Sequence, residues 1–172
     1  MRVKICGIKT VEDLKNTVLA GADALGFLVG QLHASPDFIL PSTAARLAKL
    51  APPYVTPVIV THLVEADSIS EIVLKTGIHT IQLHGGSDLK QVKKLRKQLP
   101  HNSKIILACH IILDKIEPNS EEFFPFIDAI LLDSFNKTSG QVGGTGKIHN
   151  WNKSKEIAES SKVPVILAGG LN

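Results

Sequence analysis

The sequence predicts an α/β fold in which parallel strands alternate with helices. Short apolar runs and longer amphipathic segments follow one another along all 172 residues. Several apolar runs are continuous, such as Ile105-Ile106-Leu107-Ala108 and Val165-Ile166-Leu167-Ala168. Strands have this composition when helices cover the sheet and both strand faces are buried. A closed barrel and an open doubly wound sheet both produce the pattern, but no Gly-x-Gly-x-x-Gly follows the first strand, which disfavours a dinucleotide-binding open sheet.

Seven strands are predicted where an apolar run ends at glycine, proline or a polar residue. They cover residues 3–6, 24–29, 55–61, 80–83, 104–108, 129–132 and 165–168. The helices between them cover residues 10–21, 41–51, 68–77, 88–99 and 151–161, and the weakly periodic segment 111–126 is also assigned a helix. No linker or low-complexity tract interrupts this alternation, so we expect one domain over residues 1–172.

Two of the helices carry clear end signals. Thr10-Val11-Glu12-Asp13 is suited to cap the first helix, and Gly21 is placed to end it. Ser68-Ile69-Ser70-Glu71 has the pattern of a capping box that opens the third helix, and Gly77 ends that helix.

The composition excludes several classes of protein. Hydrophobic residues make up 44% and charged residues 20% of the chain, which is ordinary for a globular domain and argues against disorder. The formal net charge is +3, and the densest basic run falls on one predicted helix without an aromatic platform. We interpret that run as a solvated face and expect no nucleic-acid partner. Its members are Lys90, Lys93, Lys94, Arg96 and Lys97.

The sequence also favours a cytoplasmic location. No apolar run approaches the length of a membrane span, so we expect no membrane partner. The first residues read as a strand and lack the apolar core of a signal peptide. Without export, Cys6 and Cys109 are expected to be reduced thiols.

Polar and reactive residues gather where the predicted strands end, which is where βα barrels place their catalytic groups. They are Cys6-Gly7, His33-Ala34-Ser35-Pro36, His62, Gln82-Leu83-His84-Gly85, Cys109-His110, Asp133-Ser134, Gly143-Gly144-Thr145-Gly146 and Gly169-Gly170. A zinc site built from His62, His84, Cys109 and His110 is an alternative reading of this cluster. No Cys-x-x-Cys or His-x-x-x-His spacing supports it, so we expect no metal.

In their order along the chain, these segments resemble the phosphoribosylanthranilate isomerase family of tryptophan biosynthesis. Each match is weak alone, and the ordered set is strong. The resemblance implies a TIM-type (β/α) barrel, an isomerase that needs no cofactor, and a phosphorylated small-molecule substrate. The matching segments are Lys4-Ile5-Cys6-Gly7-Ile8, Gly21-Ala22-Asp23-Ala24-Leu25-Gly26-Phe27, Ser35-Pro36, Gln82-Leu83-His84-Gly85, Leu131-Leu132-Asp133-Ser134, Gly143-Gly144-Thr145-Gly146 with Trp151, and Leu167-Ala168-Gly169-Gly170-Leu171-Asn172.

The family reaction is an Amadori rearrangement that turns an aminoaldose into an aminoketose. A general acid protonates the furanose ring oxygen, and a general base removes the proton from the neighbouring sugar carbon. The resemblance assigns the base to Cys6 and the acid to Asp133. A free cysteine at a strand end is otherwise a small buried hydrophobe, and an aspartate there otherwise caps a loop or pairs with a lysine. An apolar strand leads directly into Asp133, and desolvation there would favour the protonated acid.

The resemblance also implies a set of binding residues. Substrate contacts fall on Gly7, His33, Gln82 and His84, and the phosphate contacts fall on Gly144, Thr145, Gly146, Gly169 and Gly170. Glycines let backbone N–H groups approach an anion closely, and the loop after the seventh barrel strand is a frequent phosphate site.

Two departures from the family pattern bear on the substrate. Asp37 follows Ser35-Pro36 where the family has an arginine that engages the anthranilate carboxylate, and an anion there should repel that group. His33 is a partial substitute. His149-Asn150 stand where the family has Phe-Asp. A diverged relative acting on another sugar phosphate therefore remains an alternative.

Only Gly169-Gly170-Leu171-Asn172 follow the seventh strand, so we expect the chain to be short of the family's eighth strand–helix pair. A barrel without that pair has open edges. We therefore expect this polypeptide to be inactive in its 172-residue form and to self-associate through the open edge. A non-catalytic barrel that binds a phosphorylated ligand is the third hypothesis.

Overall fold

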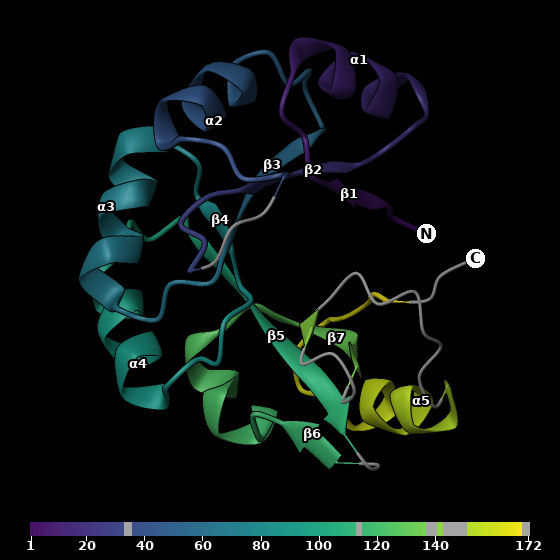
Figure 1. Cartoon of the computed structure of the whole chain (residues 1–172). Helices are drawn as coiled ribbons and strands as arrows, with labels where there is room; N and C mark the ends of the chain where they lie inside the picture. The colour runs from purple at the N-terminus through teal and green to yellow at the C-terminus, as the bar shows by residue number, and fades with distance from the viewer. Residues whose placement is uncertain (33–35, 113–114, 137–140, 143–150, 170–172) are drawn as a thin grey trace. The chain divides into compact units, whose positions relative to one another are not determined.

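The computed structural model describes residues 1–32, 36–112, 115–136, 141–142 and 151–169. The chain divides into two compact units, Met1–Lys104 and Ile105–Asn172 (Figure 1). Each unit is an α/β structure with a parallel sheet, and each is described by itself.

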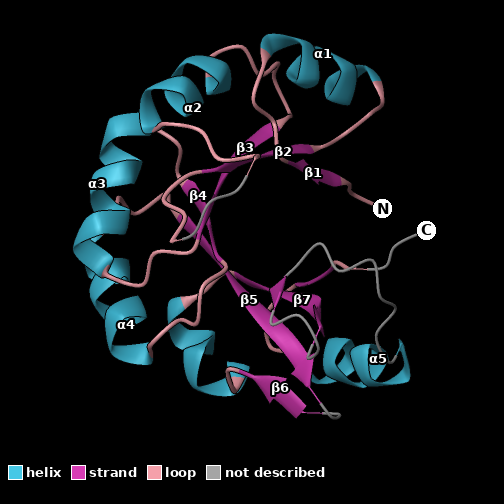
Figure 2. Ribbon diagram, viewed as in Figure 1, coloured by secondary structure: helices cyan, strands magenta, loops and turns pink. Residues whose placement is uncertain are grey.

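The first unit repeats a strand followed by a helix four times. In chain order it contains β1 (Lys4–Cys6), α1 (Val11–Leu19), β2 (Ala24–Leu28), α2 (Pro41–Ala48), β3 (Thr56–Thr61), α3 (Ala66–Thr76), β4 (Thr80–Leu83) and α4 (Leu89–Gln98). Neighbouring strands are parallel in the order β1-β2-β3-β4. The four helices lie along one side of these strands (Figure 2).

Side chains alternate between the two faces of this sheet. On the helix-covered face, four large residues are completely buried: Leu25, Phe27, Ile59 and Ile81. The opposite face carries Lys4 and Cys6 on β1 and Gln82 on β4, because these residues fall on the alternate positions. The largest buried apolar side chains therefore lie on one face of the sheet, and the reactive side chains lie on the other face together with the buried Val58 and Val60.

The helix ends show which local signals the fold uses. At α1 the predicted cap is confirmed: the Asp13 N–H donates to Thr10 Oγ1 at 3.0 Å, and the Thr10 N–H donates to Asp13 Oδ2 at 2.9 Å. The predicted capping box at Ser68 is wrong, because α3 begins two residues earlier. There the Ala66 N–H donates to the side-chain oxygen of Gln91 on α4 at 3.1 Å. Gly77 ends α3 in the left-handed conformation, as predicted.

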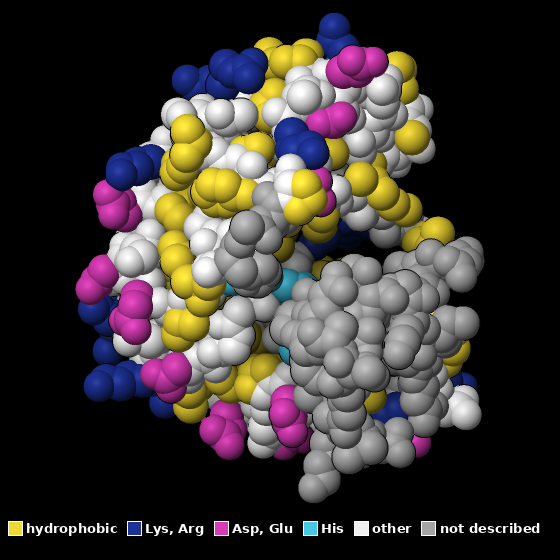
Figure 3. Space-filling view, in the orientation of Figure 1, with side chains coloured by type: hydrophobic (Ala, Val, Ile, Leu, Met, Phe, Trp, Pro, Cys, Tyr) yellow, Lys and Arg dark blue, Asp and Glu magenta, His cyan; other side chains and the backbone are white. Residues whose placement is uncertain are grey.

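The four lysines of the basic run are exposed on α4, as predicted (Figure 3), whereas Arg96 is half-buried and donates to the Ser103 carbonyl at 3.0 Å. Lysine and arginine side chains alternate there with acidic ones along the helices of the first unit. Lys94 pairs with Asp67 of α3 at 2.7 Å, and Gln98 donates to the same carboxylate at 2.7 Å. These two hydrogen bonds lower the pKa of Asp67. The charges of α4 thus connect neighbouring helices.

The second unit contains three parallel strands and two short antiparallel additions. In chain order its elements are β5 (Lys104–Ile112), β6 (Lys115–Glu117), the 3-10 helix η1 (Ser120–Phe126), β7 (Ala129–Asn136), β8 (Gln141–Val142), α5 (Trp151–Ser160) and β9 (Val165–Leu167). β7 lies between β5 and β9 and is parallel to both. β6 is antiparallel to the end of β5 (Figure 1), and β8 is antiparallel to the end of β7.

The helix expected over residues 111–126 is wrong. β5 runs on to Ile112, β6 turns back along it, and a 3-10 helix completes the segment. Pro118 and Pro125 explain the difference, because proline lacks the N–H of an α-helical hydrogen bond and clashes with the preceding turn. The β-branched pair Ile111-Ile112 favours the strand extension.

The seven predicted strands are all present and parallel within their units, which confirms the predicted parallel α/β fold. β5 and β7 are longer than predicted, so His110 and Asp133 lie within strands and not beyond them. No helix in the described part of the chain is long and apolar enough to cross a membrane. That both units belong to one domain stays a prediction.

Candidate active site

Cys6 ends β1 with an exposed thiol that lies directly over Gly26. The two residues are partners in the β1–β2 register, and a Cβ on Gly26 would meet Cys6 Sγ at 2.6 Å. The Gly7 N–H donates to the Gly26 carbonyl at 3.0 Å, and the φ of +85° at Gly7 turns the chain away from the sheet. The missing side chain at Gly26 therefore gives the thiol its place at the carboxyl end of β1.

A polar chain crosses the same face of the sheet from β1 to β4. Lys4 Nζ donates to Gln82 Oε1, and Gln82 Nε2 lies 3.0 Å from His84 Nδ1. Lysine can only donate, so the Gln82 amide oxygen faces Lys4 and the NH₂ group faces the histidine. His84 Nδ1 is then the acceptor, and the neutral ring carries its proton on Nε2. Gln82 is 2% exposed, so this buried amide fixes both partners.

His84 also stands beside His62, which follows β3. The two ring centroids are 5.5 Å apart and the ring planes are tilted by 33°. Gly85 allows this approach, because a Cβ there would lie 2.3 Å from the His62 carbonyl oxygen. The predicted substrate residues Gln82 and His84 are thus brought together, with His62 as a neighbour.

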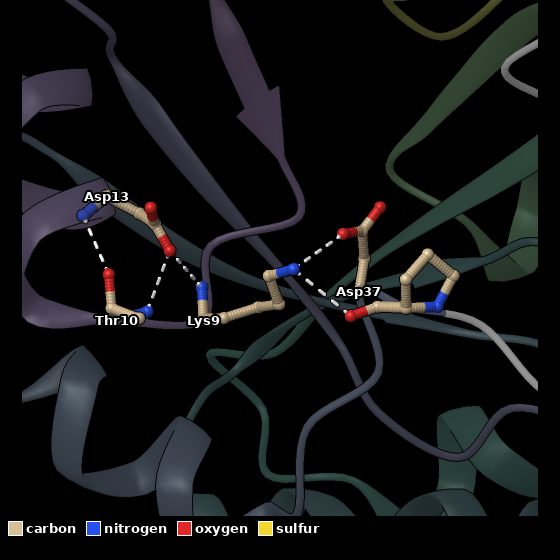
Figure 4. A network of polar contacts seen from close by, with 5 residues as sticks. Lys9, Thr10, Asp13 and Asp37 are labelled. Carbon is tan, nitrogen blue, oxygen red and sulfur yellow. Dashed lines mark hydrogen bonds and ion pairs between the residues drawn. The ribbon is translucent and has the colours of Figure 1, made fainter.

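Asp37, the departure from the family pattern, is paired with Lys9 (Figure 4). Lys9 Nζ lies 3.1 Å from Asp37 Oδ1 and donates to the Pro36 carbonyl at 3.1 Å. The backbone N–H of Lys9 donates to Asp13 Oδ2 at 3.1 Å, which ties this loop to the start of α1. The Asp37 carboxyl group also packs against Gly7, the residue after Cys6. A lysine ammonium therefore offsets the negative charge of Asp37.

Asp133 lies on β7 and is 4% exposed. Its partner in the β5–β7 register is His110. Positions two and four residues earlier on both strands are apolar and buried, forming a cluster of Ile106, Ala108, Ala129 and Leu131. Burial lowers the pKa of His110, and the negative charge of Asp133 acts in the opposite direction. The Asp133 carboxyl group thus lies next to a buried apolar layer and beside the imidazole of His110.

Cys109 is excluded from the reactive face. It is completely buried, and the strand alternation points it away from the face that carries His110. Burial raises the pKa of the Cys109 thiol to about 12, so the group stays protonated. In the described part of the chain, no three His, Cys, Asp or Glu side chains are placed to hold a metal ion.

Of the predicted phosphate residues, Gly169 is described. It follows β9 with a φ of +75°, a conformation that glycine adopts without strain. The other predicted binding residues that lie outside the described residues are His33, Gly144, Thr145, Gly146 and Gly170. His149-Asn150 lie outside them as well.

Sequence reasoning missed three residues that neighbour the predicted ones: Gly26 and Lys9 in the first unit, and Glu117 in the second. Gly26 could have been found by pairing the first two strands, because it falls opposite Cys6. Lys9 has no local signal, since its partner Asp37 is distant in sequence. Glu117 pairs with His110 across an antiparallel strand that was predicted as a helix.

The comparisons with known proteins identify the family of the chain. Residues 3–172 match the family described as N-(5'phosphoribosyl)anthranilate (PRA) isomerase. The chain is 42% identical to N-(5'-phosphoribosyl)anthranilate isomerase 2 of Methanosarcina mazei, over 99% of this chain and 75% of that protein.

Solved structures give the same result. Phosphoribosyl anthranilate isomerase from Thermus thermophilus is similar with a TM-score of 0.79 and 27% identity, over 99% of this chain and 78% of that one. A phosphoribosyl anthranilate isomerase in complex with reduced 1-(o-carboxyphenylamino)-1-deoxyribulose 5-phosphate is similar with a TM-score of 0.73 and 27% identity, over 100% and 77%. The chain therefore spans about three quarters of the length of these relatives.

Proposed function

The chain belongs to the N-(5'-phosphoribosyl)anthranilate isomerase family, and on that premise we propose that it isomerises N-(5'-phosphoribosyl)anthranilate in tryptophan biosynthesis. The fold is the family's TIM-type (β/α) fold. The observation that carries the proposal is the family match over residues 3–172. The reaction opens the furanose ring of an aminoaldose and moves protons between neighbouring carbons, which needs one acid and one base.

We propose Cys6 as the base. Its thiol is exposed at the carboxyl end of β1, on the face away from the helices, and this position is open to a substrate. As a thiolate it would take the proton from the sugar carbon next to the aminated one. Cys109 is unsuited to this step, because burial keeps its thiol neutral.

We propose Asp133 as the acid. A carboxyl group buried next to an apolar layer takes up a proton more readily than an exposed one, and the protonated form is the one that donates a proton to the ring oxygen. The apolar layer of Ala108 and Leu131 directly before Asp133 and His110 supplies that environment.

The remaining contacts follow the parts of the substrate. We propose that Gly7, Gln82 and His84 contact the sugar and anthranilate moieties, with His33 beside them. Gly169 and Gly170, with the loop of Gly144, Thr145 and Gly146, would present backbone N–H groups to the phosphate. A relative holds a phosphorylated product analogue, which supports the same class of ligand here.

Asp37 does not argue for a different substrate. Its charge is offset by Lys9, and the ammonium group lies on the loop that follows Cys6. We propose that the anthranilate carboxylate therefore meets no net negative charge at this position. We also propose that the protein works in the cytoplasm, where the Cys6 thiol stays reduced.

Complementation of a tryptophan auxotroph tests the function. The full-length gene and its Cys109→Ala variant should restore growth, and Cys6→Ser and Asp133→Asn should not. Purified Cys6→Ser and Asp133→Asn should lose about 10²- to 10⁴-fold in kcat, the usual contribution of a general acid or base. Wild-type turnover by Cys6→Ser would exclude the base, and no growth with folded wild-type protein would exclude the function.

A further inference from the structure

Three titratable residues form a row across neighbouring strands of the second unit. His110 on β5 pairs in register with Asp133 on β7. On its other side His110 pairs with Glu117 on the antiparallel strand β6, which lies along the end of β5 (Figure 1). Residues directly opposite one another on paired strands lie on the same face, about 5 Å apart. Glu117, His110 and Asp133 therefore stand side by side.

Exposure to solvent changes along this row. Asp133 is 4% exposed, His110 is half-buried and Glu117 is exposed. The residues preceding Asp133 and His110 on this face are Leu131 and Ala108, which are buried and apolar. A proton that reaches Asp133 from the side of β6 thus comes from solvent near the exposed Glu117, passes to the half-buried imidazole of His110 and then reaches the buried carboxyl group.

The reaction creates a need for such a path. In each turnover Asp133 gives its proton to the ring oxygen, and the base takes one from carbon. The enzyme must then lose a proton from the base and return one to Asp133 before the next substrate reacts. The exposed Cys6 can release its proton directly to water, whereas Asp133 is buried.

We propose that His110 returns this proton, passing its own to the Asp133 carboxylate and taking another from solvent on the Glu117 side. The step breaks an N–H bond of the imidazolium and forms the O–H bond of the carboxylic acid. His110 is reprotonated by water or a buffer acid. The proposal rests on the proposed role of Asp133 as the general acid, which it extends.

The electrostatics of the pair suit this role. Burial lowers the pKa of His110, while the charge of the Asp133 carboxylate raises it. The imidazole consequently holds a proton best when Asp133 has just lost its own, and releases it once Asp133 is neutral. Asp133 and Glu117 are the acidic residues in register with His110 on the paired strands. The basic residue Lys115 of β6 is in register with Ile112, two residues further along β5.

The test is the buffer dependence of kcat in the full-length enzyme. His110→Ala should lower kcat about 10- to 100-fold in dilute non-transferring buffer and leave kcat/KM close to wild type. Added imidazole should restore kcat in a concentration-dependent manner, because a soluble proton donor replaces the missing one. His110→Gln, which keeps a polar side chain but cannot carry the proton, should show the same loss and serves if His110→Ala fails to fold.

The kcat values of the His110 variants test the proton transfer from His110 to Asp133. Wild-type kcat in both variants, or a loss that neither imidazole nor other small buffer acids restore, would overturn the relay and leave His110 a structural residue. Asp133→Asn separates the two proposals: it should be inactive in every buffer. An active Asp133→Asn variant would refute the acid assignment itself, whatever His110 does.

Discussion

The two cysteines place the same chemical group in opposite environments. Cys6 is exposed over a glycine at the end of β1, whereas Cys109 is buried and burial raises its thiol pKa to about 12. Only thiolates react with alkylating reagents at a useful rate. We expect iodoacetamide to modify Cys6 alone in the folded protein and both cysteines after unfolding, as read by peptide mass spectrometry. Modification of Cys109 in the native state would show that its strand opens.

The pair of His110 and Asp133 makes a second prediction at the scale of single residues. The Asp133 carboxylate raises the pKa of His110, so Asp133→Asn should lower that pKa further below its usual range. The measurement is the pH titration of the His110 ring signals by NMR. Asp128→Asn is the matched control, because Asp128 accepts from the Ile105 N–H at 2.9 Å at the opposite end of these strands. An equal effect of both variants would mean that Asp133 does not face His110.

At the scale of elements, the α1 cap links acid pH to stability. The N–H groups of Lys9 and Thr10 and the Thr10 hydroxyl lower the pKa of Asp13. A carboxyl group whose pKa falls on folding stabilises the native state above its ordinary pKa, and this contribution is lost as pH falls through the lowered value. Asp13→Asn should therefore destabilise the protein at neutral pH and match wild type in strong acid.

Urea unfolding at several pH values measures this difference. Glu12→Gln is the control, because it removes a charge from the same first turn and leaves the capping box intact. A gap between Asp13→Asn and wild type that stays constant down to strong acid would show that the carboxylate charge is not what the cap uses.

The elements also show how far sequence reasoning reaches. The seven strands and the predicted end of α3 at Gly77 follow from local patterns, because apolar runs and glycines act on their own neighbours. The start of α3 does not, since its first N–H is satisfied by Gln91 of the next helix. Weak periodicity around Pro118 does not predict the observed strand and 3-10 helix, although proline there disfavours an α-helix.

The candidate site also contains residues that local sequence predicts and residues that depend on strand register. The prediction of Cys6 and Asp133 depends on a reactive residue that ends or follows an apolar run within a motif of the family. The partners that give them their environment, Gly26 and His110, come from strand register. Register is a long-range property that a single sequence specifies only through the packing of whole strands.

At the scale of the whole molecule, two of the described parallel strands have one paired neighbour each: β1 pairs with β2, and β9 with β7. Both edges carry exposed apolar side chains, with Ile5 43% and Leu167 40% exposed. Strand edges with unpaired backbone groups and apolar side chains favour association with another chain. We therefore predict that the 172-residue polypeptide self-associates reversibly, which light scattering across a dilution series would measure.

A lysine substitution on one edge strand distinguishes association through strand edges from association through scattered exposed apolar side chains. Ile5→Lys should weaken the association, because a charged side chain on an edge strand opposes strand pairing. Leu74→Lys is the control: Leu74 is 75% exposed on helix α3, away from either strand edge. If both lysine variants weaken the association equally, scattered surface hydrophobicity is the cause. If only Ile5→Lys does so, the open strand of β1 is part of the interface between copies of this chain.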